Sequence, residues 1–286
     1  MNRQLIDSHC HVHFQAYKDD MDEVIARTLE NGVQMITVGT QSDTSAKAIE
    51  IAEKYDGVWA TIGLHPNHLH NQEFFDSDEL PPEEQGTDKI KTRAEKFDIE
   101  YYKKLASHPK VVAVGEFGLD YYHLPPNIDR EQMIQDQKNA AKEQLHFATE
   151  VAKPVIIHSR DAFEDQIELI KDEIAKGGLQ KRGVIHSFTG TAEQAAAYWQ
   201  LGFYIGLNGI LTFSKELQAE VKKIPLEQIL VETDAPYLSP PPFRGKRNEP
   251  WHVQFVAEKI TEIKGLSFDE VAQITTANTI KLFGLK

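Results

Sequence analysis

Apolar and polar residues of this chain form blocks that predict strands and helices in regular succession. Eight short apolar runs, most of them rich in β-branched residues, predict buried strands over residues 4–13, 33–39, 58–64, 111–120, 154–160, 183–190, 203–209 and 229–237. Helical periodicity is predicted over 21–31, 44–55, 132–151, 162–175, 192–201, 215–224, 249–263 and 268–283. Strands that alternate with helices are typical of a parallel sheet.

Polar residues at the ends of these strands favour a closed barrel over an open sheet. An open doubly wound sheet has no reason to place polar residues at the end of nearly every strand. A barrel builds its active site at that rim, from the ends of several strands. We therefore expect an α/β fold, a (β/α)8 TIM barrel, with residues 1–286 forming a single domain.

One segment interrupts the alternation of strands and helices. Residues from about 70 to 97 are polar and acidic, where a short loop is expected after the third strand. Two interpretations stay open for this insertion beside the barrel mouth. It is either a lid or filter on substrate size, or a solvated surface excursion of the kind that loops tolerate at low free-energy cost.

Composition narrows the classes of function and location. A net charge of −13 argues against a protein that coats nucleic acid through a broad basic face. It does not exclude a nuclease whose active site binds a single phosphate. The single cysteine, Cys10, excludes an internal disulfide and fits a reducing compartment. With no export signal and no apolar run of about 20 residues, we expect a cytoplasmic protein with no membrane association, and we favour a monomer.

The strand ends carry side chains that bind divalent metal ions. In chain order they are His9, His11, His65, Glu116, His158, His186 and Asp234. Imidazole nitrogens mixed with carboxylate oxygens suit Zn²⁺, Mn²⁺, Fe²⁺ or Co²⁺, whereas Mg²⁺ prefers oxygen ligands. Six ligands from this set of seven are too many for one open catalytic ion and fit two. Glu116 and Asp234 set against two divalent ions leave a formal charge of about +2, which favours an anionic substrate such as a phosphate ester.

Alternation along the first strand divides its polar residues between two faces. Side chains at i, i+2 and i+4 of a strand point the same way, so Asp7, His9 and His11 are expected to share one face. Cys10 is expected to point to the other face and pack against helices. We expect Asp7 to orient a ligand rather than bind metal itself.

Six segments form an ordered set of motifs: DSHCH (7–11), GLHP (63–66), GEFGLDY (115–121), IHSR (157–160), HSFTG (186–190) and ETDAPYL (232–238). Residues 244–250 and 275–278 extend the match. The set resembles the TatD family of metal-dependent deoxyribonucleases, within the amidohydrolase superfamily. The resemblance implies a (β/α)8 barrel, divalent metal ions and hydrolysis of phosphodiester bonds in DNA, often as a 3′→5′ exonuclease.

Carried over by position, the resemblance assigns the metal ligands: His9, His11, Glu116 and Asp234 for the first ion, and Glu116, His158 and His186 for the second. Glu116 is thus shared by two divalent ions, which the sequence does not identify among Mg, Mn, Zn, Fe and Co. Glu116 and Asp234 are the expected catalytic residues. Asp234 is the expected general base, which takes a proton from the attacking water.

The resemblance also implies contacts with a DNA or nucleotide phosphodiester substrate. His65 is expected to contact the scissile phosphate, and Arg160 and Arg244 are candidates for further phosphate contacts, because the guanidinium fork matches phosphate oxygens. Tyr121 is expected either to stack on a base or donate to a phosphate, or to pack in the core.

Two alternative functions stay open. The same metal ligands could serve hydrolysis of an amide, a lactone or a phosphotriester, because fold and ligands do not fix the leaving group. In a different class, the protein could be a non-catalytic metal-binding partner of other proteins.

Overall fold

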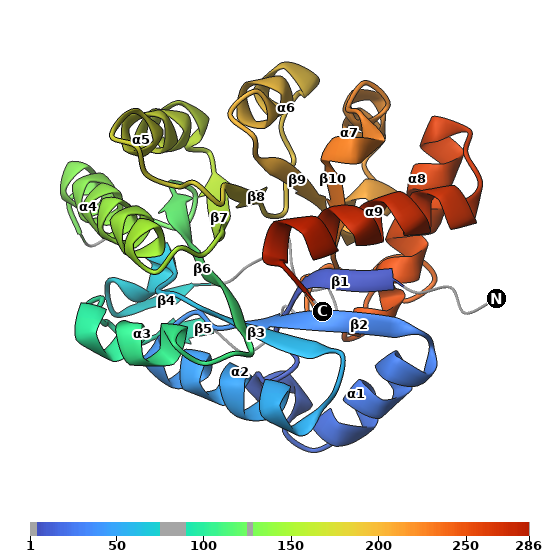
Figure 1. Cartoon of the computed structure of the whole chain (residues 1–286), viewed down its shortest axis with the longest axis horizontal. Coiled ribbons are helices and arrows are strands. Elements are labelled where there is room, and N and C mark those ends of the chain that lie inside the picture. Colours follow the sequence, from blue (N-terminus) through green and yellow to red (C-terminus); the bar gives the residue numbers. More distant parts are fainter. Residues whose placement is uncertain (1–4, 75–89, 125–127, 286) are drawn as a thin grey trace.

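Eight parallel strands form one sheet that curves into a nearly closed barrel, as the alternation predicted (Figure 1). The computed structural model describes residues 5–74, 90–124 and 128–285. The strands of the barrel are β1 (Leu5–Cys10), β2 (Val33–Val38), β3 (Val58–Ile62), β6 (Val111–Asp120), β7 (Val155–Arg160), β8 (Gly183–Ile185), β9 (Tyr204–Leu207) and β10 (Ile229–Val231). Their order around the sheet is their order along the chain.

The barrel closes where β1 meets the segment that follows β10. Cys10 pairs with Ala235 in a parallel bridge, and the backbone N–H of His11 donates to the carbonyl of Ala235 at 2.7 Å. The N–H of Asp234 donates to the carbonyl of His9 at 2.8 Å. Closure therefore brings two of the predicted metal-binding strand ends directly together.

Helices surround the barrel in Figure 1: α1 (Met21–Glu30), α2 (Ser42–Lys54), α3 (Ile99–Ala106), α4 (Arg130–Glu150), α5 (Phe163–Ala175), α6 (Ala192–Trp199), α7 (Lys215–Val221), α8 (Val253–Lys264) and α9 (Phe268–Phe283). Helix α3 was not predicted. The helix expected over 249–263 is divided into a 3-10 turn, η5 (Pro250–His252), and α8. Within the described parts of the chain, every helix is too short or too polar to cross a membrane.

A small apolar core fills the barrel near the beginnings of the strands. Ile156, Val184 and Leu230 belong to it, and Leu282 and Phe283 at the end of α9 pack against it. A larger core lies between the strands and the helices. Because strand side chains alternate, the residues two positions after these three interior residues also face inward, above the apolar core. These residues are His158, His186 and Glu232.

Strand β1 departs from the strict alternation that the sequence suggested. Leu5 and Cys10, five positions apart, both pack in the outer core, and the pairing with β2 shifts register between Asp7 and Cys10. Asp7 is in register with Met35, which also packs in the outer core. The prediction that Asp7 shares a face with the two histidines of β1 is therefore wrong, because the register shift moves the histidines to the interior.

The insertion is described only at its two flanks, since residues 75–89 lie outside the described residues. Strand β4 (Gln72–Phe74) pairs antiparallel with β5 (Ile90–Thr92). The Nε2 of Gln41, just before α2, donates to the carbonyl of Arg93 at 2.9 Å. The N–H of Glu95 donates to the carbonyl of His68 at 2.8 Å. The flanks are thus attached near the rim of the barrel, and both interpretations of the insertion stay predictions.

Candidate metal centre

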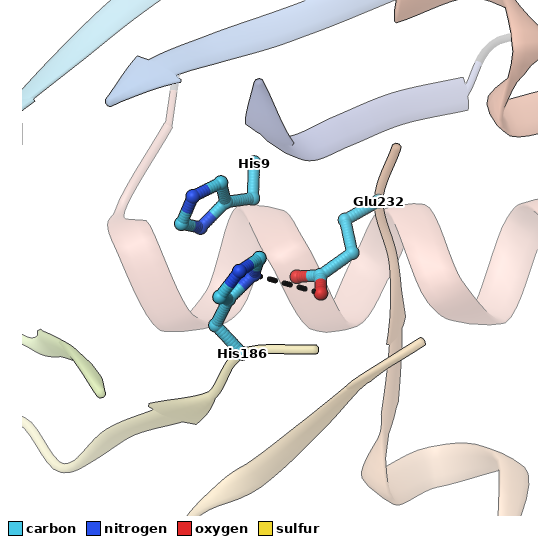
Figure 2. Close-up of side chains that lie close together, drawn as sticks. All are labelled: His9, His186 and Glu232. Atoms are coloured by element: carbon cyan, nitrogen blue, oxygen red, sulfur yellow. Dashed lines mark ion pairs between the residues drawn. The ribbon is translucent and has the colours of Figure 1, made fainter. Parts of the chain in front are cut away.

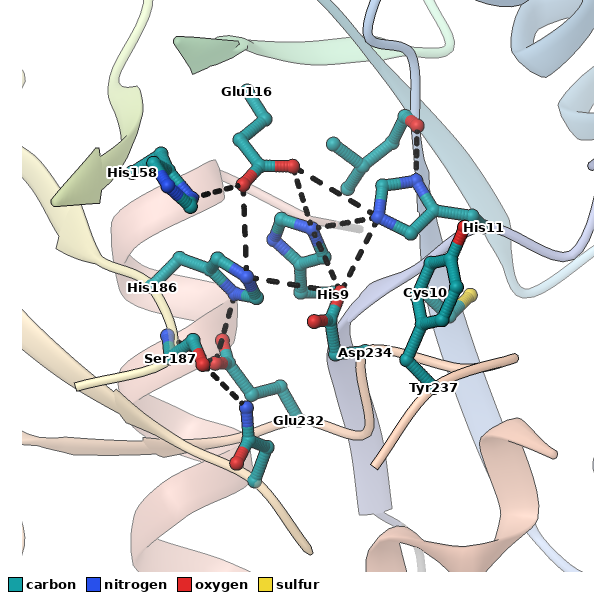
Figure 3. A network of polar contacts seen from close by, with 12 residues as sticks. His9, Cys10, His11, Glu116, His158, His186, Ser187, Glu232, Asp234 and Tyr237 are labelled. Carbon is teal, nitrogen blue, oxygen red and sulfur yellow. Dashed lines mark hydrogen bonds and ion pairs between the residues drawn. The ribbon is translucent and has the colours of Figure 1, made fainter. Parts of the chain in front are cut away.

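Four predicted ligands meet where β1, β6 and the segment after β10 come together (Figure 3). The Nε2 atoms of His9 and His11 lie 3.2 Å apart. Oε2 of Glu116 lies 3.4 Å from Nε2 of His9, and Oδ1 of Asp234 lies 3.3 Å from Nε2 of His11. We call His9, His11, Glu116 and Asp234 the inner group. Its two histidine side chains are only 0% and 4% exposed.

A second set of side chains contacts the other oxygen of Glu116. Nδ1 of His158 lies 3.0 Å from Oε1 of Glu116, and Nε2 of His65 lies 3.5 Å from the same atom. We call His65, Glu116 and His158 the outer group. Its histidine side chains are 12% and 16% exposed, so this group is more open to solvent than the inner one.

His186 lies between the two groups. Its Nε2 is 3.7 Å from Oε1 of Glu116 and also 3.7 Å from Oδ1 of Asp234. Its ring stacks on His9 with the ring centroids 3.5 Å apart. Figure 2 shows its Nδ1 directed at Glu232, 2.9 Å from Oε1. The position of His186 therefore suits a ligand to either of two ions.

Hydrogen-bond partners decide which nitrogen each histidine offers to the centre. Nδ1 of His11 lies 2.7 Å from the carbonyl oxygen of Val38, which can only accept, so Nδ1 donates and Nε2 keeps its lone pair. The same reasoning applies to Nε2 of His158, which lies 3.2 Å from Oδ2 of Asp120. Nδ1 of His186 makes no hydrogen bond among the described residues, but Oε1 of Glu232 lies 2.9 Å from it, and this negative charge favours the proton on Nδ1. All three neutral rings then direct a lone pair at the cluster.

His65 has the opposite arrangement. Its Nδ1 accepts a hydrogen bond from the backbone N–H of Asn67 at 3.1 Å, so its Nε2 carries the proton of the neutral ring. A protonated Nε2 donates and does not bind metal. The partners of His65 therefore favour the predicted phosphate contact over ligation, although its position would also suit a metal ligand.

The donors at this centre fit a divalent cation. Two Nε2 atoms face each other at 3.2 Å, and Nδ1 of His9 is buried with no hydrogen-bond partner among the described residues. Burial alone would raise the pKa of Glu116 and of Asp234, but the surrounding histidines outweigh it and hold both pKa values well below their usual range. Both carboxylates are thus charged at neutral pH and available to a metal ion.

Sequence reasoning missed two carboxylates behind the ligands, Asp120 and Glu232. Asp120 is fully buried, and its Oδ2 also accepts from Nδ1 of His123 at 2.8 Å. Its Oδ1 accepts from the backbone N–H groups of residues 122 and 123. The spacing contains a signal for both: Asp120 is four positions after Glu116, and Glu232 is two before Asp234, so each pair shares a strand face.

The three remaining predicted substrate contacts lie at the ends of strands or in the loops beyond them. Arg160 is the last residue of β7, two positions after His158. Arg244 is exposed in the segment after β10, where it donates to the carbonyl of Ser239 at 3.2 Å. The hydroxyl of Tyr121 donates to Asp165 on α5 at 2.7 Å. This bond favours the packing role among the two predicted for Tyr121.

The barrel and its rim of histidines and carboxylates are typical of metal-dependent hydrolases. A family model described as TatD related DNase matches residues 6–284. The chain belongs to the TatD family.

Individual relatives agree with this assignment. The chain is 39% identical to the metal-dependent hydrolase YabD of Bacillus subtilis, over 98% of each protein. It is 31% identical to the human deoxyribonuclease TATDN3, over 98% of this chain and 94% of that protein. The crystal structure of YJJV, a TatD homologue from Escherichia coli K12, matches with a TM-score of 0.81 at 29% identity and covers all of both chains. The chain is thus a metal-dependent hydrolase, and its histidine and carboxylate groups support the use of a divalent metal.

Proposed function

We propose that this protein hydrolyses phosphodiester bonds in DNA with two divalent ions and removes nucleotides from the 3′ end. The observation that carries the proposal is the position of Glu116, whose two carboxylate oxygens face the inner and the outer group separately. A carboxylate shared in this way suits two adjacent ions, which is the arrangement of many enzymes that cleave phosphate esters. The name of the human relative, a deoxyribonuclease, supports DNA as the substrate.

Bound divalent ions would lower the pKa of the attacking water and stabilise charge on the phosphate. In this proposal Asp234 takes the proton from that water. Its carboxyl group is buried and lies 3.3 Å from His11, which holds it in place. Because its pKa lies well below the usual range, it is deprotonated at neutral pH. A base this weak would accept a proton only from a water whose own pKa the bound ions had lowered.

His65 serves as the donor to the scissile phosphate in this proposal. Its Nε2 carries the proton, as the bond from Asn67 requires, and its side chain is partly exposed at the rim. The ring of His158 lies 4.4 Å from that of His65, and Arg160 follows His158 by two positions at the end of β7, where its guanidinium is the candidate for a second phosphate contact. These residues bind and orient the substrate, while the metal ligands hold the ions.

The test compares the protein with the Asp234→Asn variant on single-stranded DNA labelled at either end and on bis-p-nitrophenyl phosphate. We expect the protein to shorten DNA from its 3′ end, and the variant to lose about 10²–10³-fold or more in rate. Asp165→Asn, which changes a carboxylate on α5, is the matched control and should keep its activity. Full activity of Asp234→Asn would refute the role of this residue. The proposed function would be refuted if this protein cleaved amides or lactones faster than every phosphodiester tested.

A further inference from the structure

Two exposed aromatic side chains lie at the same rim as the metal centre. Four large apolar side chains are exposed among the described residues: Tyr122, Phe213, Leu266 and Ile280. Only the first two are aromatic, with 50% and 42% of their surface exposed. Each has a guanidinium carbon 4.0 Å from its ring centroid, from Arg160 over Tyr122 and from Arg244 over Phe213.

The first pair adjoins the outer group. Tyr122 follows Asp120 by two positions, and its backbone N–H donates to the carboxylate that also contacts His158. Arg160 follows His158 by two positions on β7 and therefore points to the same side of the strand. The ends of two neighbouring strands, β6 and β7, thus hold this pair beside a metal ligand.

The second pair is anchored on the other side of β8. Phe213 directly follows the 3-10 turn η3 (Gly209–Thr212), which comes after β9, and Arg244 follows β10. The side-chain amide of Asn208, directly before η3, donates to Oγ of Ser187 at 2.8 Å. The N–H of Ser187 in turn donates to Glu232, the partner of His186. These hydrogen bonds connect the start of the turn that precedes Phe213 to the metal centre.

A third pair of the same kind shows what a purely structural contact looks like. Arg247 lies 4.5 Å above the ring of Tyr17, but that ring is fully buried, and the guanidinium donates to both carboxylate oxygens of Asp20. Such contacts occur about once in 70–80 residues of ordinary proteins, so their number here is no evidence of a function. What distinguishes the two pairs at the rim is an exposed aromatic ring.

We propose that the Tyr122–Arg160 and Phe213–Arg244 pairs are base-binding subsites on the two sides of the cleaved phosphate. This inference rests on the proposed function and names how its substrate is held. Exposed aromatic faces stack on nucleobases without regard to sequence, and a guanidinium can add stacking or a phosphate contact. With a net charge of −13, the protein gains no general attraction for a polyanion, so local contacts of this kind must provide the affinity.

The inference is tested by binding, separately from cleavage. The probes are a fluorescent single-stranded phosphorothioate octanucleotide and an abasic strand with the same number of phosphates, each measured by fluorescence anisotropy. The protein should bind the strand with bases more tightly. Tyr122→Ala and Phe213→Ala should each weaken that binding about 5- to 100-fold and leave the abasic strand unaffected. Tyr122→Phe and Phe213→Tyr should retain it, and Ile280→Ala, which removes an exposed side chain of α9, is the matched control.

Cleavage separates this inference from the proposed function. In each alanine variant we expect a higher KM for DNA, whereas the rate of cleavage of an abasic strand of the same length, which has no base to stack, should be unchanged. Equal binding of the two strands by the protein, or equal losses for both strands in the alanine variants, would overturn the base-binding subsites. If the protein binds bases through these residues but cleaves no phosphodiester, the subsites stand and the proposed function fails.

Discussion

The inner and outer groups share Glu116 but are built from different parts of the fold. The inner group forms where the barrel closes, from β1 and the segment after β10, and its histidines are almost completely buried. The outer group forms at the ends of β3, β6 and β7, and its histidines are partly exposed. The inner group is therefore part of the closure of the barrel, whereas the outer group depends on residues at the rim. We therefore expect the outer ion to exchange more readily.

The largest effect is expected for Glu116→Ala, which removes the residue common to both groups. We expect loss of both ions and a decrease in hydrolysis of more than about 10³-fold, since loss of one preorganised electrostatic group alone costs about 10²–10³-fold. Metal content by mass spectrometry and rates with bis-p-nitrophenyl phosphate provide the measurement. Glu150→Ala, at the end of α4, is the control. Retention of one tightly bound ion by Glu116→Ala would show that the groups do not depend on a shared carboxylate.

The two groups should differ in how metal binding depends on pH. Burial alone would lower the pKa of His158, but its contacts with Asp120 and Glu116 outweigh burial and raise this pKa to about 9. Burial lowers the pKa of His9. A proton must therefore leave the outer group on metal binding below pH 9, and affinity there should fall about tenfold per pH unit between pH 9 and 7.

Calorimetry in buffers with different ionisation enthalpies measures this proton release directly. We expect the inner ion to bind without releasing a proton from His9 at neutral pH, and the outer ion to release one from His158. Burial alone would lower the pKa of His186, but Glu232 and Asp234 outweigh it and raise this pKa, so the ion that His186 binds releases one further proton. The same pH dependence for both binding steps would remove the distinction between the groups.

A smaller effect is expected for Asp120→Asn, which changes the residue that orients His158. Partners of this kind contribute about 10- to 100-fold in metal affinity. We expect a loss of this size for the outer ion and little change for the inner one, measured by titration with Mn²⁺ or Zn²⁺. Asp165→Asn is the control, because this carboxylate contacts Tyr121 and no metal ligand. Equal weakening of both ions by Asp120→Asn would indicate a general loss of structure.

The smallest effect concerns His252, a histidine outside both groups. It makes the stability of the fold depend on pH independently of metal binding. Burial lowers the pKa of His252 to about 4, so between pH 7 and 5 the unfolded chain takes up a proton that the folded protein does not. Stability therefore falls as the pH decreases. His252→Gln should reduce this fall in unfolding free energy by about 1–2 kcal/mol, measured by urea unfolding at pH 7 and pH 5. An unchanged pH dependence would show that His252 is not its source.

The sequence identified the residues that meet at the candidate metal centre better than the residues that orient them. Period-two alternation is local, so the apolar strands of the barrel and the polar residues at their ends could be recognised one strand at a time. The partners of the ligands depend on which strand or loop lies next to them, as with Val38 beside His11. The register shift in β1 could not be predicted for the same reason, because it depends on how β1 pairs with β2. Contacts between loops, such as Arg244 on Phe213, leave no periodic signal at all.

Closure of the barrel has a consequence for the order of folding. Asp7 accepts hydrogen bonds from Thr233, 226 positions later in the chain, and the inner group assembles at this junction. During synthesis at about 5–20 residues per second, His9 waits about 10–45 s before Asp234 is made. Contacts of such long sequence separation form late and slow folding. The inner ion can therefore stabilise only a nearly complete barrel, and metal supply should affect the survival of late intermediates rather than the first steps of folding.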